Sequence, residues 1–174
     1  MERIFCDPRK CLGCRACEVA CAVEHSQTKG LFSAISEEEL PLPRRAVQAF
    51  QGMNLSLSCR HCEDAPCIDA CITGALTQDP KGAVICDTTK CVGCCMCTMV
   101  CRFGLLAPTL VVAKCDYCPD RQDRTGRVRY ACVEACPTDA LFVGEYENFQ
   151  RLLRQPVAPR FEFGKLTVTE GEKP

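Results

Sequence analysis

The apolar residues of this chain lie in short runs that predict brief β-strands. Arg3-Ile4-Phe5-Cys6-Asp7 has the pattern of a short strand, and we expect Ile4-Phe5 to pair with Leu141-Phe142, far along the chain. Val47/Ala49 and Leu55/Leu57 alternate with polar residues, which predicts a hairpin just before Cys59. The pattern therefore predicts one strand pair made of distant segments and one made of neighbouring segments.

Two further patterns follow later in the chain. Ala75-Leu76-Thr77 and Ala83-Val84-Ile85 flank the turn sequence Asp79-Pro80-Lys81-Gly82, which predicts a second hairpin. A short helix, which Pro156 ends, should have four apolar residues on one face: Tyr146, Phe149, Leu152 and Leu153. Phe161-Glu162-Phe163 then indicates an extended segment. We expect the apolar stripe to pack on the rest of the chain, with docking on a partner as the alternative.

Composition limits how such short elements are held together. The chain has 174 residues, of which 19 are cysteine and only 6% are aromatic, so a core of large side chains would be thin. Cysteine at this density indicates either disulfides or metal ligands. The N-terminus lacks the pattern of a secretory signal, the number of cysteines is odd, and they cluster at short intervals. We therefore interpret them as metal ligands.

Charge and hydropathy argue against several functions. The formal net charge is −1, which gives no indication of binding to nucleic acid or to an anionic membrane. The longest apolar candidate, residues 103–113, contains Pro108 and is shorter than the ~20 residues of a membrane span. We expect a cytoplasmic protein without a transmembrane segment.

The strongest signal is the spacing in Cys11-Leu12-Gly13-Cys14-Arg15-Ala16-Cys17-Glu18-Val19-Ala20-Cys21. Three thiolates at this spacing fit three corners of a cubane of iron and sulfide. Cys21 lies about one helical turn beyond Cys17 and is expected to reach a different cluster, as in two-cluster ferredoxins. A helix should begin near the third cysteine of each run and point its N–H groups at an anionic cluster. Three more runs follow: Cys59, Cys62, Cys67 and Cys71; Cys91, Cys94, Cys97 and Cys101; and Cys115, Cys118, Cys132 and Cys136.

Two segments repeat within the chain and indicate that its halves are copies of one unit. Ile4-Phe5-Cys6-Asp7 followed by Lys10-Cys11-Leu12-Gly13-Cys14 recurs as Val84-Ile85-Cys86-Asp87 followed by Lys90-Cys91-Val92-Gly93-Cys94. Residues 67–76 likewise match residues 132–141.

The runs must be paired to complete four [4Fe–4S] clusters. The segment between Cys71 and Cys91 is long enough for the second hairpin, so the second and third runs resemble a complete two-cluster ferredoxin. The first and fourth runs then remain to form another. Pairing in chain order is the alternative, which spacing does not exclude. The crossed pairing gives a first set (Cys11, Cys14, Cys17, Cys136), a second set (Cys21, Cys115, Cys118, Cys132), a third set (Cys59, Cys62, Cys67, Cys101) and a fourth set (Cys71, Cys91, Cys94, Cys97).

These patterns predict an α+β fold with two units of the bacterial two-cluster ferredoxin type, related by internal repeat. Residues 1–21 with 115–145 form the outer unit, and residues 59–101 form the inner unit. Residues 22–58 are an insert that carries the first hairpin, and residues 146–174 are a C-terminal tail.

The four runs resemble the four-cluster ferredoxin subunits of molybdopterin oxidoreductases, membrane-bound hydrogenases and nickel-dependent carbon monoxide dehydrogenases. The match covers roughly residues 1–145 and implies the crossed pairing. The small size, the lack of a membrane helix or twin-arginine leader, and the opening residues 11–25 are most similar to the electron-transfer subunit of carbon monoxide dehydrogenase. The resemblance implies a non-catalytic protein that relays single electrons from that dehydrogenase to a hydrogenase or another reductase. The alternative is an iron–sulfur subunit of a hydrogenase, formate dehydrogenase or molybdopterin oxidoreductase complex.

Three cysteines lie outside the four sets. Cys6 and Cys86 occupy equivalent strand positions and are expected to act as small apolar side chains. Cys95 adjoins Cys94 and becomes a ligand if the assignment shifts by one. His61 lies between two predicted ligands and is expected not to bind iron.

Several basic residues lie close to the cysteines. Arg60, Arg102 and Lys114 adjoin predicted ligands, where positive charge would favour reduction of an anionic cluster; ordinary surface charge is the alternative. The segment 121–129 carries Arg121, Arg124, Arg127 and Arg129 and is expected to be a surface loop that helps a partner to dock.

Two other classes of function stay open on the sequence. A redox enzyme with a substrate-binding cluster would need a run that lacks a cysteine, and all four runs are complete. Structural zinc sites of four cysteines each are the other class.

Overall fold

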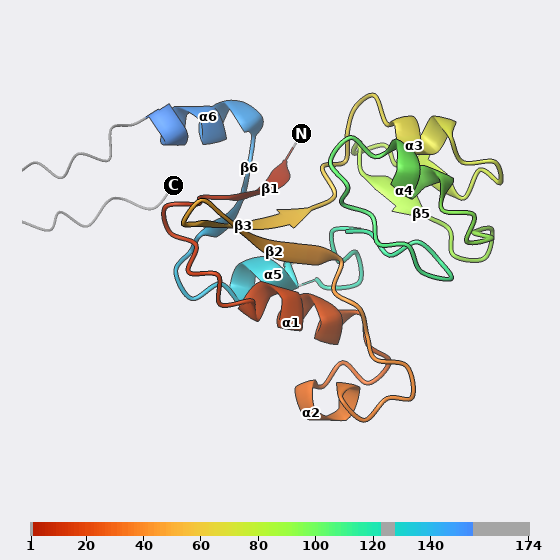
Figure 1. Ribbon diagram of the computed structural model, residues 1–174, viewed down its shortest axis with the longest axis horizontal. Helices are drawn as coiled ribbons and strands as arrows, with labels where there is room; N and C mark the ends of the chain where they lie inside the picture. Colours follow the sequence, from red (N-terminus) through yellow and green to blue (C-terminus); the bar gives the residue numbers. More distant parts are fainter. Residues whose placement is uncertain (1, 123–127, 155–174) are drawn as a thin grey trace, which may run out of the picture.

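Short sheets and short helices make up the fold (Figure 1). The computed structural model describes residues 2–122 and 128–154. In this part of the chain the strands form antiparallel pairs: β1 (Arg3–Cys6) with β6 (Leu141–Gly144), β2 (Arg45–Phe50) with β3 (Met53–Ser58), and β4 (Leu76–Gln78) with β5 (Val84–Cys86). The α+β class predicted from the sequence is confirmed.

The pair β1–β6 joins the two ends of the cysteine-containing region. Ile4 lies opposite Val143 and Phe5 opposite Phe142, which confirms the predicted pairing of these segments. Just beyond the pair, the Asp7 N–H donates to the Ala140 carbonyl at 2.8 Å. The strand pair therefore fixes the start of the first cysteine run beside the end of the fourth.

Both predicted hairpins are present. The turn between β2 and β3 places Gln51 and Gly52 at positive φ, as a two-residue turn between twisted strands requires. In the turn between β4 and β5, the Asp79 carboxylate accepts hydrogen bonds from the N–H groups of Lys81 and Ala83. Local turn chemistry thus closes each hairpin.

Each of four helices begins one residue before the third cysteine of a run, as predicted. They are α1 (Ala16–Glu24), α3 (Pro66–Asp69), α4 (Met96–Val100) and α5 (Ala131–Glu134). Helix α1 continues past Cys21, so the predicted unit boundary at residue 21 falls inside a helix. Helix α2 (Leu31–Ala34), a single turn within the insert, was not predicted from the sequence.

The buried side chains form two clusters, and cysteines contribute to both. The first contains Ile4, Cys6, Cys17, Val47, Cys132 and Leu141. The second contains Ala65, Cys67, Leu76, Val84, Cys97 and Leu106. Since Val47 belongs to β2, the hairpin of the insert packs on the elements that carry the first and fourth runs.

The C-terminal helix α6 (Tyr146–Arg154) packs on this chain's own strands, as expected. The Phe149 ring stacks on Phe5 with centroids 4.5 Å apart and lies 5.8 Å from Phe142. Pro156 and the predicted extended segment 161–163 lie outside the described residues. Within the described residues, none of the helices has the length and apolar character needed to cross a membrane.

Candidate metal centres

All 19 cysteines are free thiols. No disulfide joins any of them, and most are buried or partly buried. The disulfide interpretation therefore has no support, and the thiols are available as metal ligands.

The first set meets at one cavity. Cys11, Cys14 and Cys17 line it together with Cys136 from the other end of the chain. Pairing of the runs in chain order would require Cys71 at this cavity, and Cys71 instead lines a different one. The strand pair β1–β6 explains this arrangement, because it holds the first and fourth runs side by side.

The fourth set also shares a cavity. Cys91, Cys94 and Cys97 line it with Cys71, and Cys86 and Cys95 lie at its wall. The Cys95 sulfur contacts the Gly93 carbonyl oxygen at 3.3 Å, and the residue itself precedes α4 in the left-handed conformation. The short hairpin β4–β5 connects the second run to the third.

The third set lines a more open cavity. Its lining includes all four cysteines of the set: Cys59, Cys62, Cys67 and Cys101. Aromatic residues distant from these cysteines in the sequence also line it: Phe5, Tyr117, Tyr146 and Phe149. Burial raises the pKa of Cys67, and negative charge on Cys59 and Cys101 raises it further. These thiols therefore lie close enough to interact electrostatically.

The second set is the most deeply buried. Burial raises the pKa of Cys115 to about 12, and charge on Cys132 and Cys21 adds to the rise. Burial likewise raises the pKa of Cys118 to about 11, with further contributions from Asp116, Cys132 and Cys21. These interactions place Cys21 close to three cysteines of the fourth run: Cys115, Cys118 and Cys132.

The surroundings of these thiols suit an anionic iron–sulfur cluster. Backbone N–H groups point at sulfur: Ala140 donates to Cys136 Sγ at 3.2 Å, and Arg44 donates to Cys21 Sγ at 3.3 Å. Burial alone would raise the pKa of Cys136, but hydrogen bonds from residues 138–141 outweigh burial and lower this pKa. The described residues that line the first and fourth cavities include no carboxylate. The N–H donors, and the lack of a carboxylate among the described residues that line the first and fourth cavities, favour a negatively charged sulfur cluster.

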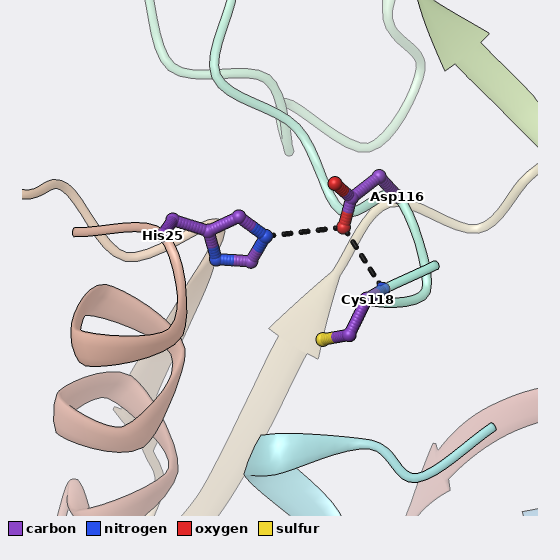
Figure 2. Close-up of side chains that lie close together, drawn as sticks. All are labelled: His25, Asp116 and Cys118. Atoms are coloured by element: carbon purple, nitrogen blue, oxygen red, sulfur yellow. Dashed lines mark hydrogen bonds and ion pairs between the residues drawn. The ribbon is translucent and has the colours of Figure 1, made fainter. Parts of the chain in front are cut away.

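A polar group beside the second set was missed in the sequence (Figure 2). His25 donates from Nδ1 to the Cys21 carbonyl at 2.7 Å, and its Nε2 lies 3.1 Å from the Asp116 carboxylate. Arg44 pairs with the other oxygen of Asp116. Burial lowers the pKa of His25, but its hydrogen bonds with Asp116 and Cys21 outweigh burial and raise the pKa to about 9. His25 directly follows the last residue of α1 and lies four residues after Cys21, and this spacing was the available signal.

His25, Asp116 and Cys118 form a group that could hold a metal ion, and this group lies beside the second set. Their potential ligand atoms lie within 4.8 Å of one another. Because Cys118 is a member of the second set, we interpret His25 and Asp116 as neighbours of that cluster site. The Asp116 carboxylate also accepts the Cys118 N–H at 3.0 Å, which fixes the loop that carries the cysteine.

His61 is fully buried, with 0% of its surface exposed. Its Nδ1 accepts the Val84 N–H at 3.0 Å, and its ring stacks on Tyr117 at a centroid distance of 3.9 Å. Burial, followed by the charge of Lys114, lowers the pKa of His61 to about 3, so the ring is neutral and its proton is on Nε2. Among the described residues, Nε2 has no hydrogen-bond partner. That His61 does not bind iron stays a prediction.

The basic residues near the ligands differ in burial. Arg102 is exposed, and Arg60 lies with its guanidinium carbon 6.0 Å from the centre of the Phe103 ring. Lys114 is buried, so the interpretation as an ordinary surface charge is wrong for this residue. In the arginine-rich segment, Arg121 pairs with Glu24 and Glu134. Arg124 and Arg127 lie outside the described residues.

The sets of four thiols on this α+β fold define an iron–sulfur protein of the ferredoxin type. Residues 50–146 match the family described as "4Fe-4S dicluster domain". The chain is 40% identical over 166 residues to an iron–sulfur protein of Rhodospirillum rubrum, covering 87% of this chain and 86% of the relative. The chain belongs to this family, which favours iron–sulfur clusters over zinc.

Two further relatives have more informative names. The thiosulfate reductase electron transfer subunit PhsB of Salmonella typhi is 39% identical over 82% of this chain and 74% of its own length. The electron transport protein HydN of Escherichia coli is 34% identical over 86% of this chain and 91% of its own length. These relatives transfer electrons and are not catalytic enzymes. This chain is therefore an electron-transfer protein that binds [4Fe–4S] clusters, which confirms the expectation that it is not itself an enzyme.

Proposed function

We propose that this protein relays single electrons through four [4Fe–4S] clusters within a redox complex that contains a hydrogenase or a reductase. The observation that carries the proposal is the meeting of Cys136 with Cys11, Cys14 and Cys17 at one cavity. When bound, such clusters accept and pass on one electron at a time. The thiols of the four crossed sets hold them, and the N–H groups directed at sulfur stabilise their negative charge.

The proposed architecture is two ferredoxin-like units that arose from one repeat. Matched geometry supports this: the Asp87 N–H donates to the Ala75 carbonyl at 2.8 Å, like Asp7 to Ala140. Gly13 and Gly93 have φ of +71° and +68°, each two residues after the first cysteine of a run. The separate buried clusters around β1–β6 and around β4–β5 support the same division. We assign residues 1–21 with 115–145 to the outer unit and residues 59–101 to the inner unit.

The partner is inferred from the relatives. The name of PhsB supports a reductase complex better than a carbon monoxide dehydrogenase, and the name of HydN supports electron transport without giving a partner. The name of the Rhodospirillum rubrum relative gives no partner. A nickel-dependent carbon monoxide dehydrogenase as electron donor stays a prediction, as does a cytoplasmic location.

Metal content tests the number of clusters. The protein purified without oxygen should contain about 16 iron and 16 acid-labile sulfide atoms, four of each per cubane. Removal of iron by a chelator should unfold it, because ligand–metal bonds replace a large apolar core. A preparation with about eight iron atoms and full electron-transfer activity would contradict the four-cluster proposal.

Partner choice needs a separate experiment. The purified protein is mixed with a hydrogenase under hydrogen, with a formate dehydrogenase under formate, or with a carbon monoxide dehydrogenase under carbon monoxide. Reduction is followed by the loss of visible absorption of the clusters. We expect the fastest reduction with hydrogenase; reduction only by carbon monoxide dehydrogenase would restore the donor predicted from the sequence.

A further inference from the structure

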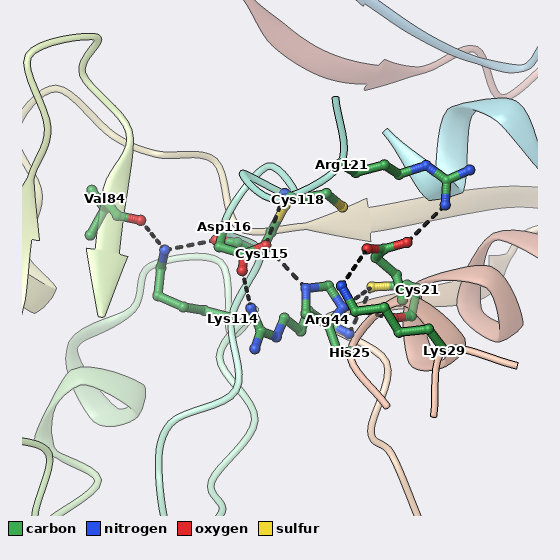
Figure 3. Close-up of polar contacts among 11 residues, drawn as sticks. Cys21, His25, Lys29, Arg44, Val84, Lys114, Cys115, Asp116, Cys118 and Arg121 are labelled. Atoms are coloured by element: carbon green, nitrogen blue, oxygen red, sulfur yellow. Dashed lines mark hydrogen bonds and ion pairs between the residues drawn. The ribbon is translucent and has the colours of Figure 1, made fainter. Parts of the chain in front are cut away.

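A buried lysine lies at the contact between the outer and inner units (Figure 3). Only 3% of Lys114 is exposed. Its ammonium group donates to the Val84 carbonyl of β5 and to the Cys115 carbonyl, the latter at 2.8 Å. Val84 belongs to the inner unit and Cys115 to the outer unit. The side chain therefore connects the two units through one charged group.

The charge of Lys114 has no protein counterpart in the described residues. No carboxylate within residues 2–122 and 128–154 forms an ion pair with it, and its two acceptors are neutral carbonyl oxygens. A buried charge is costly unless an opposite charge compensates it. Two backbone dipoles compensate an ammonium only in part. We therefore expect a negative charge close to the Lys114 ammonium group.

The residues that hold the ammonium belong to two cluster sites. Val84 lines the cavity of the third set, and Cys115 is a member of the second set. Negative charge on either cluster would thus lie within electrostatic reach of one ammonium group.

We propose that Lys114 is a buried positive charge shared by the second and third clusters. The charge raises the reduction potentials of both clusters and favours electron transfer between the units. The proposal rests on the proposed function, because it requires clusters in both sets. Net charge near a cluster is one of the determinants of its potential. A positive charge favours the reduced, more negative form. Because the charge is shielded from water, salt screens it little.

The chain supplies matched controls. Lys10, Lys90 and Lys114 each immediately precede the first cysteine of a run. Lys10 and Lys90 are exposed, and Lys90 is paired with Asp87 at 3.3 Å. Substitution of Lys10 or Lys90 removes a positive charge from the same position of the cysteine run, but that charge is exposed and not buried. The three lysines therefore separate the effect of burial from the effect of sequence position.

The test is a redox titration of the holoprotein monitored by electron paramagnetic resonance. Cys118→Ser and Cys62→Ser identify the signals of the second and third clusters. In Lys114→Met and Lys114→Gln, both signals should shift to lower potential by at least a tenfold change in the reduction equilibrium, about 59 mV for one electron. Lys114→Arg should restore most of the shift. Lys10→Met and Lys90→Met should change the potentials much less.

The variants Lys114→Gln and Lys114→Arg distinguish the effect of the positive charge from the effect of the hydrogen bonds. Both side chains carry N–H donors that can replace the hydrogen bond to the Val84 carbonyl, but only Arg keeps the positive charge. Equal potentials in these two variants would overturn the proposal, as would a shift in Lys114→Met no larger than in Lys90→Met. Iron analysis separates this outcome from a failure of the proposed function. A wild-type protein with fewer than four clusters contradicts the function, whereas full iron with unchanged potentials contradicts only the role of Lys114.

Discussion

The proposed outer and inner units hold their cysteines in loops of the same conformation but cover these loops differently. Over the outer loop lies the β2–β3 hairpin, where a Cβ on Gly13 would meet the Asn54 side chain at 2.7 Å. Over the inner loop lies irregular chain, where a Cβ on Gly93 would meet the Leu110 carbonyl oxygen at 2.5 Å. The irregular segment is held by the bridge between Ala107 and Ala113. The loop is thus common to both units, and its cover is not.

This difference shows which part of the unit the cofactor dictates. The cysteine loop, the start of the helix and the strand pair recur in both units because four thiols must converge on one cluster. The cover only has to exclude water and contribute apolar area. In the outer unit it also contacts a ligand, because Ser56 Oγ lies 3.2 Å from Cys17 Sγ. A hydroxyl group this close to a ligand sulfur can change the reduction potential of the cluster in the outer unit.

The largest effects should come from changing the cysteines that connect runs. Cys136→Ser should alter the same cluster as Cys14→Ser, and Cys71→Ser the same cluster as Cys94→Ser. Each variant should lose up to about four of 16 iron atoms. Electron paramagnetic resonance and iron analysis provide the measurement. If Cys136→Ser instead altered the cluster held by Cys94, pairing in chain order would replace the crossed pairing.

The two covers can be compared by removing one buried side chain from each. Leu106→Ala should lower the free energy of unfolding by about 3 kcal/mol, and Val47→Ala by about 2 kcal/mol, because a larger cavity costs more. Both residues are buried in their respective clusters. Urea unfolding without oxygen, followed by cluster absorption, gives the two values. An unchanged midpoint for Val47→Ala would mean that the hairpin does not support the outer unit.

The two loop glycines give a smaller and more specific comparison. Gly13→Ala and Gly93→Ala each place a side chain at positive φ, which costs about 1 kcal/mol or more. At Gly13 the Asn54 side chain can turn away, whereas at Gly93 the neighbour is backbone. Gly93→Ala should therefore be the more destabilising by about 1–2 kcal/mol. The rates at which the two variants lose iron to a chelator provide the measurement, and equal rates would contradict the difference between the covers.

The smallest effect concerns helix α6, whose Phe149 ring packs on β1 and β6 of the outer unit. Phe149→Ala removes the stack on Phe5 and should lower the free energy of unfolding by about 1 kcal/mol. Leu153→Ala on the same helix is the control, because Leu153 is exposed and should tolerate the change. Thermal melting under argon compares them. Equal melting temperatures for the two variants would show that α6 contributes little to the outer unit.

Much of this architecture could be predicted from the sequence because the signals are local or repeated. The third cysteine of each run marked a helix start, and the repeat indicated that Ile4-Phe5 pairs with Leu141-Phe142. The polar group of His25, Arg44 and Asp116 could not be predicted, because its members lie far apart in the chain. The burial of Lys114 was hidden for a similar reason. Its sequence position matches that of exposed Lys10 and Lys90, and only the contact between the units distinguishes it.

The pairing of β1 with β6 has a consequence for the synthesis of the protein. Residues 3–6 leave the ribosome long before their partner residues 141–144, which emerge only when nearly all of the described chain has been made. The strands β4 and β5 are neighbours in the chain and can pair as soon as both have emerged. During translation the inner unit can therefore fold while the first strand is still unpaired. Cofactor delivery in the cell would then proceed from the middle of the chain outwards, and a ribosome stalled before residue 141 would carry an incomplete outer unit.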